Sequence, residues 1–427
     1  MNEEIGRQPS VFYKAVKILS QGYVCNHCLG RQFAQLLSGY DNEERGRIIR
    51  NFLAFSIDSG EKMKVDMSNF EEFNFRSKDV KKSGDKKTCV ICNNVFDELE
   101  TYVKEAEKKL KKIGFDTFLV GTKLPDDLII KEEELWESIG IDWCEPLKSE
   151  INRIVGKELE KKLKKSVEFK YPDVVILINL KKKKVEVEVN PLYIYGEYNK
   201  LKRGIPQTKW PSGKYKTSVE EIIAKPLMKQ IGGKGHKFHG CGREDIDARC
   251  LAWRPFVLEI LEPKKRKINK KKLIEDVKKT KKVEIRNIEI VNSDMVEKVK
   301  SVRPDKTYRV LVKLKDDVSE EDLKKLSILK GKRIYQETPT RVLHRRADLL
   351  RKRVVKDIKW KKVGKKKIEL TITAEAGTYI KELVSGDKGR TYPSVAEILR
   401  TDAEVIELDV IKIHINKKKI EKPLENS

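Results

Sequence analysis

Residues 240–247 read Gly-Cys-Gly-Arg-Glu-Asp-Ile-Asp, and no other stretch says as much about the fold and function of this chain. Three carboxylates and an arginine stand beside two glycines, in a loop-like segment of an otherwise strongly cationic protein. Glycine lets the backbone approach a ligand closely, because no side chain intervenes. A carboxylate beside a polyanion needs a cation to stay ionised, and Arg243 is the nearest candidate in the sequence. The alternative interpretation is an exposed acidic turn without a ligand.

The composition favours a nucleic acid as partner. The 427 residues include 93 Lys and Arg against 67 Asp and Glu, a net charge of +26 that is spread along the chain. Such a field attracts nucleic acid or an anionic membrane surface, although a general bias toward lysine would also produce it. No apolar run approaches the roughly 20 residues of a membrane span, and the first residues lack the apolar segment of a signal peptide. We therefore expect a cytoplasmic, nucleic-acid-binding protein of two or three domains.

Four of the seven cysteines form two Cys-x-x-Cys pairs, Cys25 with Cys28 and Cys89 with Cys92. Two such pairs supply the four thiolates of a tetrahedral zinc site, and no further ligand is needed, so we expect structural zinc. The interval of about sixty residues exceeds that of the usual zinc ribbon, so the metal would join two distant segments. A redox pair or a chance spacing is the alternative. The other three are expected to be ordinary small apolar residues: Cys144, Cys241 and Cys250.

The first 190 residues predict a small α/β module. Hydrophobic spacing predicts helices and strands in the order helix, strand, helix, then two paired strands, after a mainly helical start. The expected helices are 11–20, 32–37, 42–55, 96–113 and 143–163; the expected strands are 117–121, 174–179 and 185–189; residues 66–84 are expected to form a loop. This order resembles the THUMP domain, an RNA-binding unit of tRNA-modifying enzymes.

A second region begins at Pro191 and predicts an α+β domain around a mostly antiparallel mixed sheet, which places the domains at 1–190 and 191–427. Residues 193–210 interleave aromatic and basic side chains, which either stack on unpaired bases or pack a strand against a core. Residues 231–237 are expected to be a flexible basic loop without the phosphate-binding P-loop pattern. The expected strands are 255–261, 283–291, 308–314 and 367–374, and the expected helices are 294–300 and 319–329, the latter capped by Ser319.

Five motifs together resemble one known family along most of the chain. They are Cys-Asn-His-Cys-Leu-Gly-Arg-Gln-Phe at 25–33, Arg-Gly-Ile-Pro-Gln-Thr-Lys-Trp at 203–210, Gly-Arg-Glu-Asp at 242–245, Gln-Glu-Thr-Pro-Thr-Arg-Val-Leu-His-Arg-Arg-Ala-Asp at 336–348 and Glu-Ala-Gly-Thr-Tyr-Ile-Lys-Glu-Leu-Val-Ser-Gly-Asp at 375–387. The family is that of the archaeal and eukaryotic tRNA pseudouridine synthases that isomerise uridines 54 and 55 in the TΨC arm. Gly-Arg-x-Asp and Gly-Thr-Tyr-Ile-Lys are shared with the wider synthase superfamily.

The resemblance implies a role for individual residues of this chain. It makes Asp245 the catalytic aspartate, with Asp247 as the competitor and Glu244 as a weaker one. It implies that Lys381 is the basic residue paired with the aspartate and that Tyr308 packs on the target base. The remaining implied roles are apolar lining of the pocket for Ile380 and Leu408, support of the loop or of the RNA backbone for Arg243, and zinc ligation for Cys25, Cys28, Cys89 and Cys92.

The implied reaction fits these residue types. Pseudouridine forms when the N1–C1′ bond is broken, the uracil rotates and C5 is joined to C1′, a change that needs no cofactor. One carboxylate suffices, either as a nucleophile or as a base at the ribose, and the uridine must leave the stack. We expect tRNA, through its TΨC arm, as the partner, with no membrane and no obligate protein partner. The alternatives are another THUMP-associated tRNA modifier, for which no nucleotide-binding fingerprint is found, and a non-catalytic tRNA-binding protein.

Overall fold

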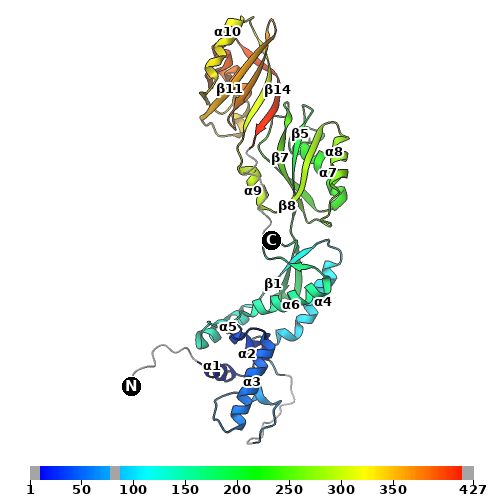
Figure 1. The fold of residues 1–427 in the computed structure, drawn as a ribbon, viewed down its shortest axis with the longest axis vertical. Coiled ribbons are helices and arrows are strands. Elements are labelled where there is room, and N and C mark those ends of the chain that lie inside the picture. Colours follow the sequence, from blue (N-terminus) through cyan, green and yellow to red (C-terminus); the bar gives the residue numbers. More distant parts are fainter. Residues whose placement is uncertain (1–9, 77–86, 416–427) are drawn as a thin grey trace, which may run out of the picture. The chain divides into compact units, whose positions relative to one another are not determined.

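The chain is described here from a computed structural model, which covers residues 10–76 and 87–415. It divides into two compact units, Met1–Asn190 and Pro191–Ser427. Of the loop expected at 66–84, residues 77–84 lie outside the described part. Among the described helices, none combines the length and the apolar character that crossing a lipid bilayer requires. Figure 1 shows the order of the elements along the chain.

The first unit combines a four-stranded sheet with six α-helices. The strands are β1 (Thr117–Lys123), β2 (Ser166–Val167), β3 (Val174–Asn179) and β4 (Lys184–Val189), in the order β2-β1-β3-β4. Strand β1 is parallel to β2 and β3, whereas β3 and β4 are antiparallel, as expected for the two paired strands. The helices are α1 (Val11–Leu19), α2 (Asn26–Gly30), α3 (Asn42–Asp58), α4 (Val95–Leu110), α5 (Asp126–Ile139) and α6 (Leu147–Leu163).

Helices α4 and α6 pack on one face of this sheet because each presents an apolar stripe. In α4 the buried residues recur at helical spacing, namely Val95, Leu99, Val103, Ala106 and Leu110. One expected element was wrong, and another begins later than expected. Only a short 3-10 turn, Arg31–Phe33, forms within the helix expected at 32–37, because the chain soon turns through positive φ at Leu37 and Gly39. The helix expected from 143 begins at Leu147, after Pro146.

The second unit is built on one large mixed sheet. Its strands are β5 (Leu192–Lys200), β6 (Gly235–Gly240), β7 (Arg249–Leu261), β8 (Val283–Val291), β9 (Asp305–Leu314), β10 (Lys332–Gln336), β11 (Arg351–Gly364), β12 (Lys367–Ala374), β13 (Thr391–Tyr392) and β14 (Ala403–His414). The order is β13-β10-β11-β12-β9-β14-β7-β5-β8, with β6 on β7. All pairs are antiparallel except β14 with β7, which are parallel over two residue pairs, Asp409 with Arg249 and Val410 with Cys250. The expected α+β class with a mostly antiparallel mixed sheet is confirmed.

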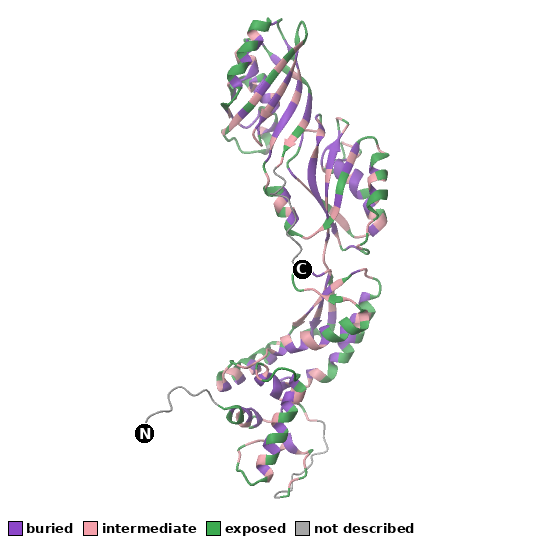
Figure 2. Cartoon of the chain, in the orientation of Figure 1, coloured by how far each residue is buried: buried purple, intermediate pink, exposed green. Residues whose placement is uncertain are grey.

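Short helices cover the two halves of this sheet. They are α7 (Val219–Ile231), α8 (Lys270–Lys278), α9 (Asp294–Ser301), α10 (Glu320–Lys324), α11 (Ile380–Ser385) and α12 (Val395–Leu399). Helices α7 and α8 share one core with β5, β7 and β8, and α10, α11 and α12 share another with the strands from β9 to β12 and β14. Figure 2 shows the buried residues along the strands of both halves. Residues 231–237 are not a flexible loop, because α7 ends at Ile231 and β6 begins at Gly235.

Candidate functional site

The acidic stretch forms the connection between β6 and β7. Gly242 has φ +73, a left-handed conformation that side chains rarely adopt. A Cβ atom there would lie 3.3 Å from Nη1 of Arg254 and 3.7 Å from Nζ of Lys306. At Gly240, a Cβ atom would lie 2.8 Å from Nε2 of Gln207. Glycine is therefore needed at both positions to let the loop lie against a layer of polar side chains.

Glu244 was the weaker of the two candidates that compete with Asp245 for the catalytic role. Its side chain points into the protein, where it has a structural role. Its side chain is fully buried and lies 3.1 Å from Nε of Arg254 and 3.7 Å from Nζ of Lys200. The hydroxyl of Tyr198 donates a hydrogen bond to its carboxylate at 3.0 Å. Tyr198 itself is inaccessible to solvent, so packing rather than base stacking explains this aromatic residue. The neighbouring carboxylates face the other way.

We expect Glu244→Gln to destabilise the second unit by about 3 kcal/mol, because Arg254 and Lys200 would stay buried without their counter-charge. Denaturant unfolding measures this difference. The matched control is Glu407→Gln, which removes the exposed carboxylate 2.8 Å from Arg203 and should cost under about 1 kcal/mol. Equal effects of the two substitutions would contradict a structural role for the buried pair.

Lys200, at the end of β5, and the string at 203–210 hold the acidic loop through hydrogen bonds to its backbone. Nζ of Lys200 donates to the backbone carbonyls of Asp245 at 3.1 Å and Ile246 at 3.3 Å, and the amide of Gly204 donates to Ile246 at 2.8 Å. Nε2 of Gln207 donates to the carbonyl of Gly242 at 2.9 Å. These bonds fix the backbone on both sides of Asp245, so its carboxylate has a defined position.

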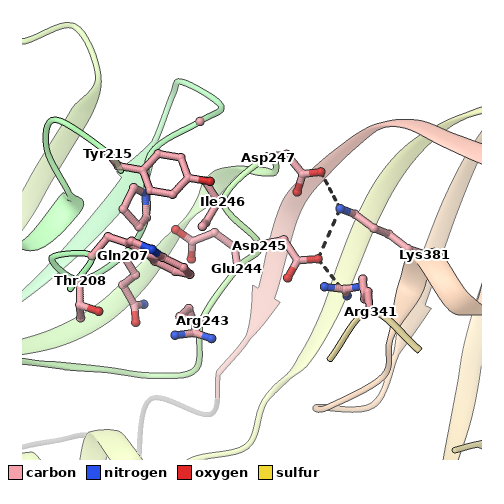
Figure 3. Close-up of a pocket in the computed structure, with 13 residues that line it drawn as sticks. Gln207, Thr208, Tyr215, Arg243, Glu244, Asp245, Ile246, Asp247, Arg341 and Lys381 are labelled. Atoms are coloured by element: carbon pink, nitrogen blue, oxygen red, sulfur yellow. Dashed lines mark hydrogen bonds and ion pairs between the residues drawn. The ribbon is translucent and has the colours of Figure 1, made fainter. Parts of the chain in front are cut away.

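Asp245, Asp247, Lys381 and Arg341 meet in one cluster (Figure 3). Oδ2 of Asp245 lies 3.2 Å from Nη2 of Arg341 and 3.6 Å from Nζ of Lys381. Lys381 begins the turn of α11 and lies nearer to Asp247, at 2.6 Å. Burial raises the pKa of Asp247, but its hydrogen bond to Lys381 and the charges of Lys381 and Arg341 lower it more, so the pKa lies below its ordinary value.

Lys381 is thus near both aspartates, and the cation closest to Asp245 is Arg341, which the sequence interpretation did not single out. Arg341 lies in a 3-10 turn, Thr340–Arg345, and its Nε also donates to Glu382 at 2.7 Å. The available signal was its place in the motif at 336–348, which contains two other arginines, Arg345 and Arg346. Sequence spacing gave no indication of which of them reaches the acidic loop.

Two adjoining cavities, of about 390 and 360 Å³, share the acidic loop, Arg341 and Lys381 as lining. The second cavity brings together every residue of the predicted substrate site: Asp245, Arg243, Tyr308, Ile380, Lys381 and Leu408. Burial raises the pKa of Tyr308 to about 12, so its hydroxyl stays protonated at neutral pH. Trp210 lines the first cavity together with Tyr215, at a ring distance of 5.5 Å. The cavities therefore combine one pair of exposed carboxylates with aromatic, apolar and cationic surfaces.

The four cysteines of the first unit meet at a candidate metal centre. All four Sγ atoms lie within 4.8 Å of one another, and those of Cys25 and Cys92 are 3.7 Å apart. Thiolates bound to zinc at about 2.3 Å in a tetrahedron lie about 3.8 Å apart, so the donor set and its geometry fit zinc. The amide of Cys28 donates to Sγ of Cys25, and the amide of Cys25 to Sγ of Cys89. The site joins the start of α2 to the turn before α4, as the long spacing predicted.

The fold and the site define a class: a pseudouridine synthase domain preceded by a THUMP domain. A family model described as the C-terminal domain of Pus10 matches residues 193–414, and one described as the archaeal Pus10 THUMP domain matches residues 102–179. The chain belongs to the Pus10 family.

Relatives named tRNA pseudouridine synthase Pus10 align over nearly the whole chain. The protein from Pyrococcus furiosus is 39% identical, over 94% of this chain and 98% of its own. The one from Methanocaldococcus jannaschii is 42% identical, over 94% of each chain. Among solved structures, a Cbf5-Nop10-Gar1 complex matches with a TM-score of 0.29 and 19% identity, over 50% of this chain and 47% of that one. A structure titled pseudouridylate synthase gives 0.23 and 15%, over 67% and 90%. The family assignment rests on the models and the relatives.

Proposed function

We propose that this protein is a tRNA pseudouridine synthase that isomerises uridines 54 and 55 of the TΨC loop, with Asp245 as its one catalytic carboxylate. The observation that carries the proposal is the position of Asp245. Its carboxylate lies at the boundary of two cavities, paired with Arg341 and Lys381 and facing the cavity that Tyr308 lines. The curated relatives carry the name of this activity.

The chemistry assigns a task to each of these side chains. The N1–C1′ bond of the uridine breaks, a C5–C1′ bond forms, C5 loses a proton and N1 gains one, so the reaction is an isomerisation without redox change or donor. The cations at 3.2 and 3.6 Å orient the carboxylate of Asp245, which acts either as a nucleophile or as a base at the ribose. Neither step requires a cofactor.

The target uridine has to leave the stack before Asp245 can reach it. The ring of Tyr308 with the apolar side chains of Ile380 and Leu408 offers an extruded uracil a partly apolar surface next to the carboxylate. Because the pKa of Tyr308 is about 12, the hydroxyl serves as a hydrogen-bond donor and not as a base at neutral pH. We therefore assign base binding to these three residues and proton or bond chemistry to Asp245.

We assign the first unit to tRNA binding, with the four cysteines holding a structural zinc ion. Its THUMP model match and the +26 charge of the chain favour contacts with phosphates and with the shape of the RNA. Zinc would supply no chemistry at the uridine, because four thiolates complete its tetrahedral coordination and leave no open position for a substrate. We propose no obligate protein partner and a cytoplasmic location, which is consistent with a tRNA substrate.

The proposal is tested by incubating the purified protein with an unmodified tRNA transcript, without added cofactor, and mapping pseudouridine by carbodiimide labelling and primer extension. We expect stops at positions 54 and 55. Transcripts with cytidine at 54 or at 55 separate the two uridines, and each should lose only its own stop. A transcript that stays free of pseudouridine would refute the enzyme and leave the non-catalytic alternative. Pseudouridine at only one of the two sites would contradict the double specificity.

A further inference from the structure

The second cavity contains more positive charge than the carboxylate beside it requires. Eight cations line it, against the two acids Glu244 and Asp245. Glu244 pairs with Arg254, and Asp245 with Arg341 and Lys381. Four further cations extend from this cluster along the cavity: Lys306, Arg346, Arg351 and Arg353. Among the described residues, no carboxylate lies within 4.0 Å of any of these four, so the cavity carries a local excess of positive charge.

The strand register places three of these cations, Lys306, Arg351 and Arg353, on one surface. Lys306 of β9 is opposite Ala374 of β12, which in turn is opposite Val355 of β11. Because side chains alternate along a strand, Arg351 and Arg353 share the face of Val355, and Lys306 shares the face of Tyr308. These three cations therefore share a face with the tyrosine of the candidate active site, and Arg346, from the segment before β11, lines the same cavity.

The three arginines are oriented by neutral groups and not by acidic side chains. Arg346 donates to the hydroxyl of Tyr379 at 3.0 Å, and Arg351 donates to Oγ1 of Thr338 at 2.9 Å and lies over the Tyr379 ring, at 5.7 Å from its centre. Arg353 donates to the carbonyl of Lys352, while its Nε is buried without a hydrogen-bond partner. These side chains are positioned, but their charges are not compensated.

Lys306 is the most buried of the four. Its side chain and backbone together are 8% exposed, although it lines the cavity. Burial, with the charge of Arg254 as a smaller cause, lowers the pKa of Lys306 to about 8. A buried cation without a counter-ion is costly, and an anion bound in the cavity would remove that cost.

We propose that Lys306, Arg346, Arg351 and Arg353 form a phosphodiester-binding subsite, which holds the backbone phosphates on either side of the extruded uridine. The proposal rests on the proposed function for the identity of the nucleotide. In this arrangement the base and the backbone of the same nucleotide occupy different parts of the cavity. The base lies against Tyr308, and the backbone lies against the four cations. Charge-assisted hydrogen bonds from guanidinium groups suit phosphate oxygens, and phosphate contacts fix the register of an RNA without reading its sequence.

A binding cycle tests the subsite with the full-length protein and an RNA hairpin that carries the TΨC loop. One variable is Arg353→Gln; the other is a neutral methylphosphonate at the phosphate on either side of the target uridine. Each change alone should weaken binding about tenfold. The two changes together should weaken binding little more than either change alone, because they remove the same contact. The variant should also lower the salt dependence of log Kd by about 0.7. Fluorescence anisotropy measures all four constants.

Arg333→Gln is the matched control, since Arg333 of β10 is exposed and its successor Ile334 is the buried residue opposite Arg353. Its effect on the binding free energy should simply add to that of the methylphosphonate, which means that the two changes are not coupled. Lys306→Gln serves as the second variant and should couple in the same way; thermal unfolding confirms that both variants fold. Additive effects of both variants at both phosphates would overturn the subsite.

Two further outcomes are distinguishable. If inorganic phosphate protects the wild type but not Arg353→Gln from thermal unfolding, while the RNA cycles are additive, the ligand is free phosphate and the RNA assignment is wrong. Pseudouridine formation in the unmodified hairpin reports on the proposed function separately. A coupled cycle without pseudouridine would refute the isomerase and retain the phosphate subsite.

Discussion

Asp245→Asn should abolish pseudouridine formation, with a loss in kcat of at least about 10³-fold, while the protein still binds tRNA. The amide keeps the shape of the side chain but is neither a nucleophile nor a base. The loop itself should not move, because its backbone is held by Lys200 and Gln207 and its buried charge belongs to Glu244. Removing one negative charge near phosphates should not weaken binding. Single-turnover rates and a separate binding titration measure the two quantities.

Asp247→Asn is the matched control for this prediction. The Asp247 side chain is 67% exposed, lies two residues away and also contacts Lys381, at 2.6 Å. We expect a much smaller loss, because Asp247 orients Lys381 and Arg341 still pairs with Asp245. A larger loss for Asp247→Asn than for Asp245→Asn would reverse the assignment of the catalytic carboxylate.

Cys89→Ser should remove the metal and unfold the segment that the metal joins. Structural zinc contributes to folding directly, because the unfolded chain has no preformed site. The four Sγ atoms lie close together in the interior, and three of the four cysteines are buried. We expect about one zinc ion per chain in the wild type and none in the variant, with a lower unfolding temperature for the first unit. Elemental analysis and calorimetry, with and without a chelator, measure both.

The control is Cys144→Ser, since Cys144 is half-buried outside the cluster and its thiol donates to the carbonyls of Gln32 and Gly140, as a hydroxyl can. It should keep the zinc ion and the unfolding temperature. A wild-type protein that is folded and free of metal would refute the zinc site, and so would a Cys89→Ser variant that retains the ion.

Spacing in the sequence predicted the features that depend on neighbouring residues, such as the Cys-x-x-Cys pairs, a helix cap and an apolar helix face. Two Cys-x-x-Cys pairs specify four ligands wherever the chain carries them, and the structure brings the four together. The Ser319 cap and the apolar stripe of α4 also depend on neighbours in the sequence, and both are present. The substrate-site residues implied by the resemblance line a single cavity, because the motifs that carry them belong to the strands, turns and helix α11 of the second unit.

The unpredicted parts depend on tertiary contacts. Arg341 is one of several arginines in its motif, and only the path of the turn at 340–345 decides that it reaches Asp245. In the acidic stretch, the resemblance ranked Glu244 below Asp245 and Asp247, but only the structure shows that Glu244 is buried against Arg254. Similarly, the glycine-rich basic residues 231–240 divide between a helix end and a strand because β6 pairs with β7, a partner beyond the loop.

Glu244 and Asp245 point in opposite directions, so the β6–β7 connection should not tolerate insertions or deletions. Glu244 is anchored in the interior and Asp245 faces the cavity, so the two positions are defined by their count from Gly242. Deleting or inserting one codon between 242 and 245 would shift this count, so Glu244 could no longer be buried while Asp245 faces the cavity. A library of single-codon insertions across the β6–β7 connection should therefore show no active clones between positions 242 and 245.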